Sequence, residues 1–474
     1  MNTLNLFSKL KALALIAVLP ATVFAAAPAS TDPVSDLRMD EVMARVLAGK
    51  DPMPGPRTCF WSRGPVSADP YINIAYPDSA TFYWAATFTM PEGASLKLDG
   101  EFPHSRYMSI ISYDGAGKPI ESVADYLIQP KAGSINPFLQ GADRNAKARS
   151  YNLDVVDGPR PADQKTGMNL TGQSRTAIHS PKYGTGQQTM LYRIYASDKG
   201  RDETGGAGLP TPVLTMADGT VLRGAESCKA LKTKQPLQLD PAAMAVPMEQ
   251  YNKLLAVAGK ISPTYPATTK PTWYPQLDRE ALYAIYTGEP VNPNAPKSEG
   301  GFYPNLDNQY IRTILNRKLG KVFVLRGKAP TTPHTVNGDA AMGTGELRYW
   351  SFCSNQGFAN TRVNGCVHDE NIPVGPDGYY TIVVSRAADR PRNAITQCGV
   401  AWLPMADDGD GTGDADVTVL QLRHMLGTQN FPNSIQAVGK VGDEEKDMGE
   451  YFPKGRYVSA SAFETAIPCQ IEKR

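Results

Sequence analysis

The stretch that decides the fold occurs twice in the chain. Residues 76–103 read YPDSATFYWAATFTMPEGASLKLDGEFP, and residues 303–330 read YPNLDNQYIRTILNRKLGKVFVLRGKAP. The copies align without a gap and share seven residues, mostly Gly, Pro and Tyr: Tyr76/Tyr303, Pro77/Pro304, Tyr83/Tyr310, Gly93/Gly320, Leu98/Leu325, Gly100/Gly327 and Pro103/Pro330. A second shared motif, Arg-Tyr-x-Ser, follows each copy at Arg106–Ser109 and Arg348–Ser351. This duplication predicts two homologous domains in tandem.

The duplicated stretch has the composition of β-strands. Thr81–Thr89 is aromatic and β-branched, and residues 94–99 alternate, with Leu96 and Leu98 facing a core. Further strands are predicted at Arg106–Tyr113, Ser150–Val156, Met190–Ala196, Gln309–Leu315, Lys321–Arg326, Glu346–Cys353, Tyr379–Ser385 and Cys398–Leu403. The predicted fold class is mainly β, with two tandem homologous β-sandwich, jelly-roll-like domains joined by a helical linker.

At 474 residues the chain is long enough for two domains and their connections. We predict a signal peptide over 1–25, an N-terminal helical segment over 26–57, a first sandwich over 58–236, a helical and proline-rich linker over 237–275 and a second sandwich over 276–474. The copies differ at one corner. Between Pro330 and Arg348 the second copy carries an insertion, where the first has only His104 and Ser105. Such an insertion is typical of a lid or a binding loop.

The N-terminus predicts export. Lys9 and Lys11 precede an apolar run over 12–23 that is too short for a comfortable membrane span, and Ala25–Ala27 offers a cleavage site. We therefore expect a periplasmic or secreted protein without a membrane span. The formal net charge of +1, with no basic run, gives no electrostatic reason to bind nucleic acid. The expected partner is a small-molecule or polysaccharide ligand.

The six cysteines of an exported chain favour disulfides. The predicted pairs are Cys59 with Cys228, Cys353 with Cys366, and Cys398 with Cys469. The alternative is a metal site made of Cys353, Cys366, His368 and Cys398. Its spacing matches no common zinc pattern.

His104 is the first candidate catalytic residue, because it directly precedes the Arg106 strand and has no histidine counterpart in the second copy. With Arg106, Tyr107 and Asp114 it would form a general acid/base cluster at one end of the sandwich. The alternative is a loop histidine bonded to backbone. In that interpretation Arg106 makes a buried ion pair, while Tyr107 and Ser109 point to the other face of the strand. His334, inside the insertion, would reach the same cleft only if the two domains pack face to face.

An acidic, glycine-rich loop covers residues 407–416. Asp408, Asp410, Asp414 and Asp416 offer the oxygen ligands that calcium prefers, although Val419 stands where an EF-hand loop would have its glutamate. Structural calcium is one interpretation and an exposed acidic loop is the other. The chain contains no Gly-x-Ser-x-Gly and no His-Glu-x-x-His, so the usual hydrolase signatures are missing.

Leu-x-Gly-x-x-Pro followed by Arg-Tyr-x-Ser, together with Asn136–Phe138 and Met448–Pro453, resembles an uncharacterised family of exported bacterial proteins with tandem β-sandwich domains. The Arg-Tyr-x-Ser strand is also similar to paired envelope domains of unknown function. The first resemblance covers nearly the whole mature chain. It implies no activity and no catalytic residue.

Two hypotheses of function follow. The first is an exported protein that binds a small or polymeric extracellular ligand in a cleft formed by sandwich loops and the domain interface. The alternative is an extracytoplasmic hydrolase or lyase that uses His104, Arg106 and Tyr107. The sequence leaves open whether the protein is an enzyme, and also its oligomeric state.

Overall fold

The computed structural model describes residues 60–162, 174–232, 268–275, 303–358, 361–411 and 413–469, together with residues 44, 45, 48, 284 and 290. The predicted signal peptide and most of the predicted linker lie outside the described residues. Of the predicted N-terminal helical segment, the description covers Ala44 and Arg45, which are helical, and Ala48. In the described part of the chain, no helix is both long and apolar enough to cross a membrane.

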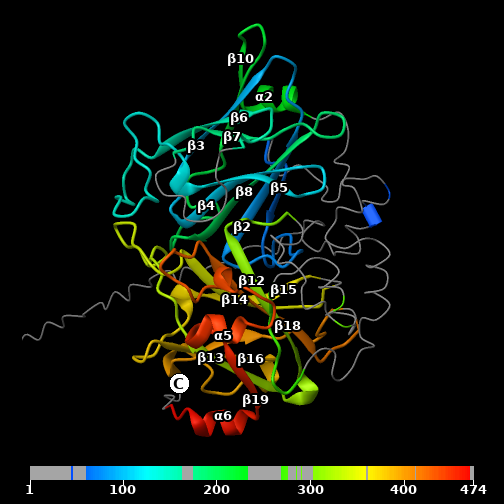
Figure 1. Ribbon diagram of the computed structural model, residues 1–474, viewed down its shortest axis with the longest axis vertical. Helices are drawn as coiled ribbons and strands as arrows, with labels where there is room; N and C mark the ends of the chain where they lie inside the picture. The colour runs from blue at the N-terminus through cyan, green and yellow to red at the C-terminus, as the bar shows by residue number, and fades with distance from the viewer. Residues whose placement is uncertain are drawn as a thin grey trace, which may run out of the picture. The chain divides into compact units, whose positions relative to one another are not determined.

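The first half is a sandwich of two five-stranded sheets (Figure 1), with strand orders β1-β2-β8-β4-β5 and β10-β9-β3-β6-β7. The strands are β1 (Arg63–Val66), β2 (Thr81–Phe88), β3 (Ser95–Glu101), β4 (Ser105–Tyr113), β5 (Pro119–Ala124), β6 (Ser150–Val156), β7 (Ala177–His179), β8 (Gln188–Ser197), β9 (Thr211–Thr215) and β10 (Val221–Arg223). Trp84, Phe88, Leu98, Met108 and Tyr192 belong to the core of this half.

The second half repeats this plan, with strand orders β11-β12-β18-β14-β15 and β17-β16-β13-β19. The strands are β11 (Tyr274–Pro275), β12 (Asn308–Asn316), β13 (Val322–Lys328), β14 (Tyr349–Asn355), β15 (Val363–His368), β16 (Tyr379–Ser385), β17 (Ala401–Pro404), β18 (Val417–Met425) and β19 (Lys454–Val458). The Arg-Tyr-x-Ser strands occupy equivalent places: β4 lies between β8 and β5, and β14 lies between β18 and β15. The chain is therefore mainly β and built from two like sandwiches, as the duplication predicts. The domain bounds stay predictions, since Pro33–Arg474 belongs to one compact unit.

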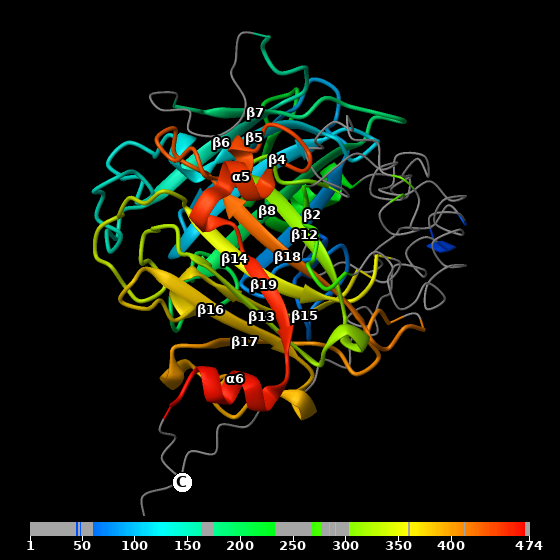
Figure 2. The ribbon, with the colours of Figure 1, turned by 60° about the horizontal axis from the view of Figure 1, so that its bottom comes forward.

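Helices are few and peripheral. The α-helices among the described elements are α2 (Gly224–Leu231), α5 (Glu444–Met448) and α6 (Ala460–Ala466). The 3-10 turns are η1 (Asp125–Leu127), η3 (Arg317–Leu319), η4 (Asp369–Asn371), η5 (Ala387–Asp389), η6 (Thr396–Cys398), η7 (Ile435–Ala437) and η8 (Gly449–Tyr451). Phe463 of α6 packs on Val322 and Val383, so this helix covers the outer face of the β16–β13 sheet (Figure 2).

Most predicted strands match the structure within one or two residues, and Ser150–Val156 and Tyr379–Ser385 match as predicted. Two predicted strands begin too early. The predicted Cys398–Leu403 strand begins only at Ala401, because a 3-10 turn ends at Cys398 and Gly399 adopts a left-handed φ of 73°. The predicted Glu346–Cys353 strand begins at Tyr349.

The strands at the centre of the molecule are buried on both faces. Every residue of β4, β14 and β18 is buried. In β14, Trp350 and Phe352 belong to the core of the second half. Tyr349 instead packs with Tyr107 and Tyr195 of the first half. The five-stranded sheets that contain β4 and β14 thus face each other, each with one side on its own core and one side on the other half.

The duplicated glycines have a packing role. Gly100 is the cross-strand partner of Tyr151, and Gly327 is the cross-strand partner of Tyr380. A Cβ atom would lie 2.6 Å from a ring atom of Tyr151 at the first site and 2.5 Å from the Tyr380 hydroxyl oxygen at the second. In each sandwich the absent side chain lets a buried tyrosine ring lie across the strand.

We expect Gly100→Ala to lower the free energy of unfolding by about 1–3 kcal/mol, because Tyr151 must move out of a packed core. Gly158→Ala is the matched control. No atom lies within 4 Å of the Cβ position at Gly158, so the expected change is below about 0.5 kcal/mol. Urea unfolding of both variants measures the difference. Equal stability of the two variants would contradict this role for Gly100.

The disulfides Cys353–Cys366 and Cys398–Cys469 form as predicted. Cys228 is also disulfide-bonded, and Cys59, its predicted partner, lies outside the described residues. The alternative metal site of Cys353, Cys366, His368 and Cys398 is wrong, because its three sulfur atoms are consumed in two disulfides.

Candidate functional site

Arg106 lies in the contact between the two halves. Its side chain is fully buried, and its Nη1 atom donates to Asp369 Oδ2 at 2.9 Å. It also pairs with Glu370, and its Nε atom donates to Thr335 Oγ1 at 2.7 Å. All three partners belong to the second half. The interpretation of Arg106 as half of a buried ion pair is confirmed, and the partners come from the other sandwich.

The second copy of the motif makes the reciprocal ion pair, from the second half to the first. Arg348 Nη1 lies 3.2 Å from Asp125 Oδ1 of the first half. Arg106 Nη1 donates to the carbonyl oxygen of Arg348 at 3.0 Å, and Arg348 Nη1 lies 3.4 Å from that of Arg106. Asp125 Oδ2 accepts from the amide of Met108, as Asp369 Oδ2 does from that of Trp350. The duplicated motif therefore joins the halves around an approximate two-fold axis, which explains why both copies need it.

Tyr107 and Asp114 lie apart from this ion pair. Tyr107 points to the opposite face of β4 and donates to Asp307 in the second half. Burial and the nearby Asp307 carboxylate raise the pKa of Tyr107 well above its usual value, and burial raises the pKa of Asp307 to about 6. Asp114 follows the far end of β4, where its carboxylate accepts from the amides of Ala116 and Lys118. The structure does not bring His104, Arg106, Tyr107 and Asp114 together, and their catalytic roles stay predictions.

His104 belongs to a different group of side chains, which the sequence analysis missed. We call His104, Arg144, Arg149, Asp198 and Arg201 the arginine cluster. Arg149 Nη1 lies 2.7 Å from His104 Nε2 and donates to the Arg144 carbonyl at 2.8 Å, while Nη2 donates to the Pro103 carbonyl at 2.9 Å. Burial, and then the positive charges of Arg149, Arg201 and Arg144, lower the pKa of His104 to about 4. At neutral pH this imidazole is therefore uncharged.

Positive charge exceeds negative charge in the buried part of the cluster. Arg144 Nη2 donates to both carboxylate oxygens of Asp198, at 2.5 and 2.7 Å. Burial, followed by the charge of Arg144, lowers the pKa of Arg149 to about 10. Within the described part of the chain, the buried Nε atom of Arg149 has no hydrogen-bond partner. Two further carboxylates interact with these arginines, those of Glu101 and Asp202, but both residues are exposed and water screens them.

The insertion of the second half, between Pro330 and Arg348, contacts the arginine cluster through its backbone. Arg144 Nη1 donates to the carbonyl oxygens of Asp339 at 2.8 Å and Thr335 at 3.3 Å. The amide of Lys199 donates to the carbonyl of Val336, and Met342 is buried in the core of the first half. The arginine cluster thus sits where loops of the first sandwich meet the insertion. His334 is an exposed residue of that insertion.

Arg144, Arg149 and Arg201 lie in loops outside the duplicated stretch. The shared motifs do not include them, and no motif in the sequence indicates that they lie near His104.

The carboxylates of the acidic loop have partners within the protein. Asp410 Oδ1 accepts from the amides of Gly413 and Asp414, Asp408 accepts from Gln356 Nε2, and Asp416 pairs with Arg317. Among the described residues, the one group of three ligand atoms within 4.8 Å of one another comes from Asp78, Cys353 and Cys366, not from this loop. Calcium binding by Asp408, Asp410, Asp414 and Asp416 stays a prediction.

Fold and site together define a tandem β-sandwich protein with a buried arginine cluster where the halves meet. No protein-family model matches the chain, and no curated protein matches it. Among solved structures, it is similar to an uncharacterised protein from Burkholderia cenocepacia, with a TM-score of 0.44 and 12% identity over 90% of this chain and 88% of that one. It is also similar to the VPA0106 protein from Vibrio parahaemolyticus, with a TM-score of 0.35 and 11% identity over 81% of this chain and 90% of that one.

Proposed function

We propose that this is an exported, periplasmic or secreted protein that binds an anionic ligand at the arginine cluster. The ligand is a small organic acid or an acidic polysaccharide, bound through a carboxylate or sulfate group. The observation that carries the proposal is Arg149, which is only 5% exposed and keeps a buried Nε atom without a partner in the described part of the chain. The disulfides support the proposed location, because they persist in oxidising compartments.

An anion suits this place for three physical reasons. Burial weakens screening, so a charge pair is stronger here than in water. A guanidinium group presents its donors in a planar fork that matches the oxygens of a carboxylate or sulfate. Burial, and then repulsion among the arginines, lowers the pKa of Arg149 and His104, and a bound anion would offset that repulsion.

Access to the cluster comes from its outer side. The side chains of His104 and Asp198 are 20% and 15% exposed, and Arg201 is an exposed residue. Arg149 is the more buried member, at 5% exposed. This difference in exposure favours a ligand whose acidic group binds at the cluster while the rest of the molecule stays outside.

The alternative function, a hydrolase or lyase that uses His104, Arg106 and Tyr107, has less support. Arg106 is saturated by acceptors of the second half, and Tyr107 points to the other face of its strand. A His104→Ala variant that keeps full activity on an identified substrate would exclude this alternative.

Calorimetry with citrate, sulfate, oligogalacturonate and a neutral oligosaccharide tests the proposal. We expect Arg149→Met to weaken anion binding by about 10- to 100-fold, the loss of one or two charge-assisted hydrogen bonds. Arg326→Met is the matched control, because Arg326 is a half-exposed arginine paired with Asp377 in the second half. It should leave binding unchanged. Tighter binding of oligogalacturonate than of citrate would identify the polysaccharide as the ligand, and the reverse order would identify the small acid.

Equal weakening in both variants, or no binding of any acid to the wild type, would overturn the proposal. Arg201→Met provides a second variant at an exposed position, in case Arg149→Met does not fold. Thermal unfolding of each variant without ligand separates lost binding from lost structure.

The pH dependence gives an independent check. The arginines keep their charge below a pH of about 10, whereas His104 gains a proton only as the pH approaches about 4. A bound anion favours that proton, so the pKa of His104 is higher in the complex than in the free protein. We expect the affinity for sulfate, which keeps its own charge, to be constant near neutral pH, to rise as the pH falls toward about 4, and to fall above about 10, where Arg149 loses its proton.

A further inference from the structure

The Cys353–Cys366 disulfide joins neighbouring strands of one sheet. Cys353 lies in β14 and Cys366 directly opposite in β15, the edge strand of that sheet. The two cysteine residues differ in exposure. Cys353 is only 1% exposed, whereas Cys366 is half-buried. A thiolate from solution can therefore reach the Cys366 sulfur more readily than the Cys353 sulfur.

Both sulfur atoms have hydrogen-bond donors nearby. Arg423 Nη1 lies 3.9 Å from Cys353 Sγ, and the amide of Ser79, from the first half, lies 3.4 Å from Cys366 Sγ. Donors of this kind stabilise a negatively charged sulfur much more than a neutral one. A disulfide by itself has little use for them.

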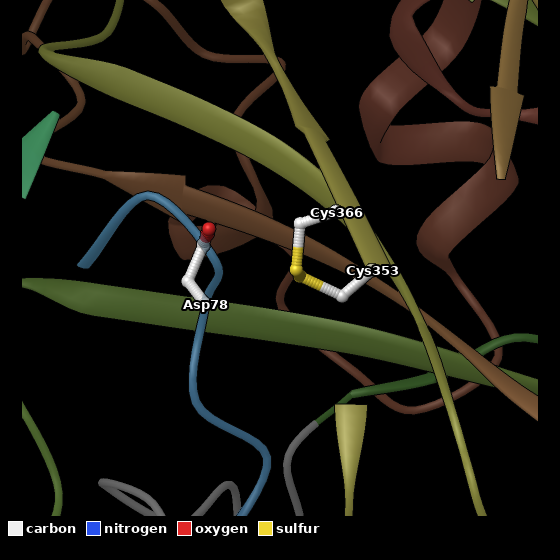
Figure 3. A group of neighbouring side chains, drawn as sticks. All are labelled: Asp78, Cys353 and Cys366. Carbon is white, nitrogen blue, oxygen red and sulfur yellow. A yellow bond between two sulfur atoms is a disulfide. The ribbon is translucent and has the colours of Figure 1, made fainter. Parts of the chain in front are cut away.

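Figure 3 shows Asp78 beside the Cys353–Cys366 disulfide. Its carboxylate pairs with the buried Arg423 and accepts from Ser351 Oγ at 2.5 Å. Its ligand oxygen lies within 4.8 Å of both sulfur atoms, an arrangement that resembles a three-ligand metal site. The guanidinium of Arg423 argues against a metal, because a cation already occupies the place where a metal ion would have to bind.

We propose that Cys353–Cys366 is a redox-exchangeable disulfide that an external dithiol reduces. One thiolate of the dithiol attacks Cys366 Sγ, forming a mixed disulfide and breaking the Cys353–Cys366 bond. Cys353 leaves as a thiolate beside Arg423 and later takes up a proton. The second thiol of the dithiol then releases Cys366, so that the dithiol is oxidised to its own disulfide and both cysteines are reduced.

The strand that carries Cys366 also contacts the first half, so reduction of the disulfide would affect the contact between the halves. Ala75 and Tyr76 donate their amides to Thr361, just before β15, and Asn73 exchanges two hydrogen bonds with Val363. With Ser79 on Cys366, this segment of the first half lies along the strand that the disulfide holds. The inference is independent of anion binding at the arginine cluster.

The test is equilibration of the folded protein with reduced and oxidised dithiothreitol at graded ratios, followed by differential alkylation and mass spectrometry. Cys398–Cys469 is the internal control, since both of its cysteines are half-buried and exposure alone would favour its reduction. We expect the equilibrium constant for reduction of Cys353–Cys366 to be at least about tenfold larger than that of Cys398–Cys469, which corresponds to a reduction potential about 30 mV higher. A constant equal to or smaller than that of Cys398–Cys469 would overturn the proposal.

Two variants assign the effect to Arg423. Asp78→Asn removes the competing carboxylate, so that the guanidinium is available to the Cys353 thiolate, and should raise the constant several-fold. Arg423→Met should lower it to the level of the control disulfide. If Arg423→Met does not fold, an unchanged constant in Asp78→Asn is enough to reject the role of Arg423. Stoichiometric binding of zinc by the reduced wild type would instead identify a metal site and overturn the redox assignment.

Discussion

Arg106→Met is expected to lower the free energy of unfolding by about 3–5 kcal/mol, the usual cost of removing one partner from a buried ion pair. The substitution leaves the carboxylate of Asp369, which is 2% exposed, without its guanidinium. It also removes the donors to Thr335 and to the Arg348 carbonyl. Because all of these partners belong to the second half, the loss weakens the join between the sandwiches and not one core alone. Urea unfolding followed by circular dichroism measures it.

Arg348→Met is the matched control, since it removes the same chemical group at the equivalent place of the second copy. The Arg348 side chain is 15% exposed and lies 3.2 Å from Asp125. Asp125 is fully buried, but it keeps the hydrogen bond from the Met108 amide, and burial raises its pKa to about 6, so it can take up a proton once the guanidinium is gone. We therefore expect a smaller loss, of about 1–2 kcal/mol. Equal losses in the two variants would contradict this difference between the two pairs. A loss below about 1 kcal/mol for Arg106→Met would show that the pair does not hold the halves together.

Asp78→Ala is expected to cost a similar amount, about 3–5 kcal/mol, for a different reason. Asp78 accepts hydrogen bonds from Tyr349 at 2.9 Å and Ser351 at 2.5 Å, and it pairs with Arg423. Alanine would leave the Arg423 guanidinium, which is 2% exposed, buried without a carboxylate. The neighbouring Tyr310 ring, 5.2 Å away, offers only a weaker cation–π contact.

The second copy supplies the control for Asp78→Ala. Asn305 stands at the position equivalent to Asp78 and lies 3.4 Å from the Tyr107 hydroxyl through Oδ1. Asp78→Asn can keep the hydrogen bonds that Oδ2 accepts from Tyr349 and Ser351, while it loses the charge and the acceptor for the Ala80 amide, so it should cost less than Asp78→Ala. The difference between the two variants in urea unfolding separates the value of the charge from that of the hydrogen bonds. If the asparagine variant is the less stable of the two, this account of the site is wrong.

The duplication predicted the fold well, because the repeated stretch shows both the alternation of a strand and the residues that pack in each core. Alternation in residues 94–99 placed Leu96 and Leu98 in the core, and both are buried. The buried ion pair predicted for Arg106 in the shared Arg-Tyr-x-Ser motif is confirmed. The sequence could not show that its partners, Asp369 and Glu370, lie in the other copy, because nothing local links residues so far apart.

The candidate site was predicted less well. Proximity in sequence grouped His104 with Arg106, Tyr107 and Asp114. A strand sends successive side chains to opposite faces and carries its ends apart, so those residues separate. The neighbours that His104 does have, Arg144 and Arg149, come from a loop whose path depends on the insertion of the second half.

The sequence by itself determined the two sandwiches, their repeated strand order, and the disulfides Cys353–Cys366 and Cys398–Cys469. These depend on alternation, on turn residues and on cysteine pairing, which are written into short stretches of chain. The tertiary structure alone decided which charges meet: Arg106 with Asp369, Asp78 with Arg423, and the arginines around His104. The physical reason is that these partners lie far apart in the chain and meet only through packing, of one half against the other for the two ion pairs and of loops within the first half for the arginines around His104.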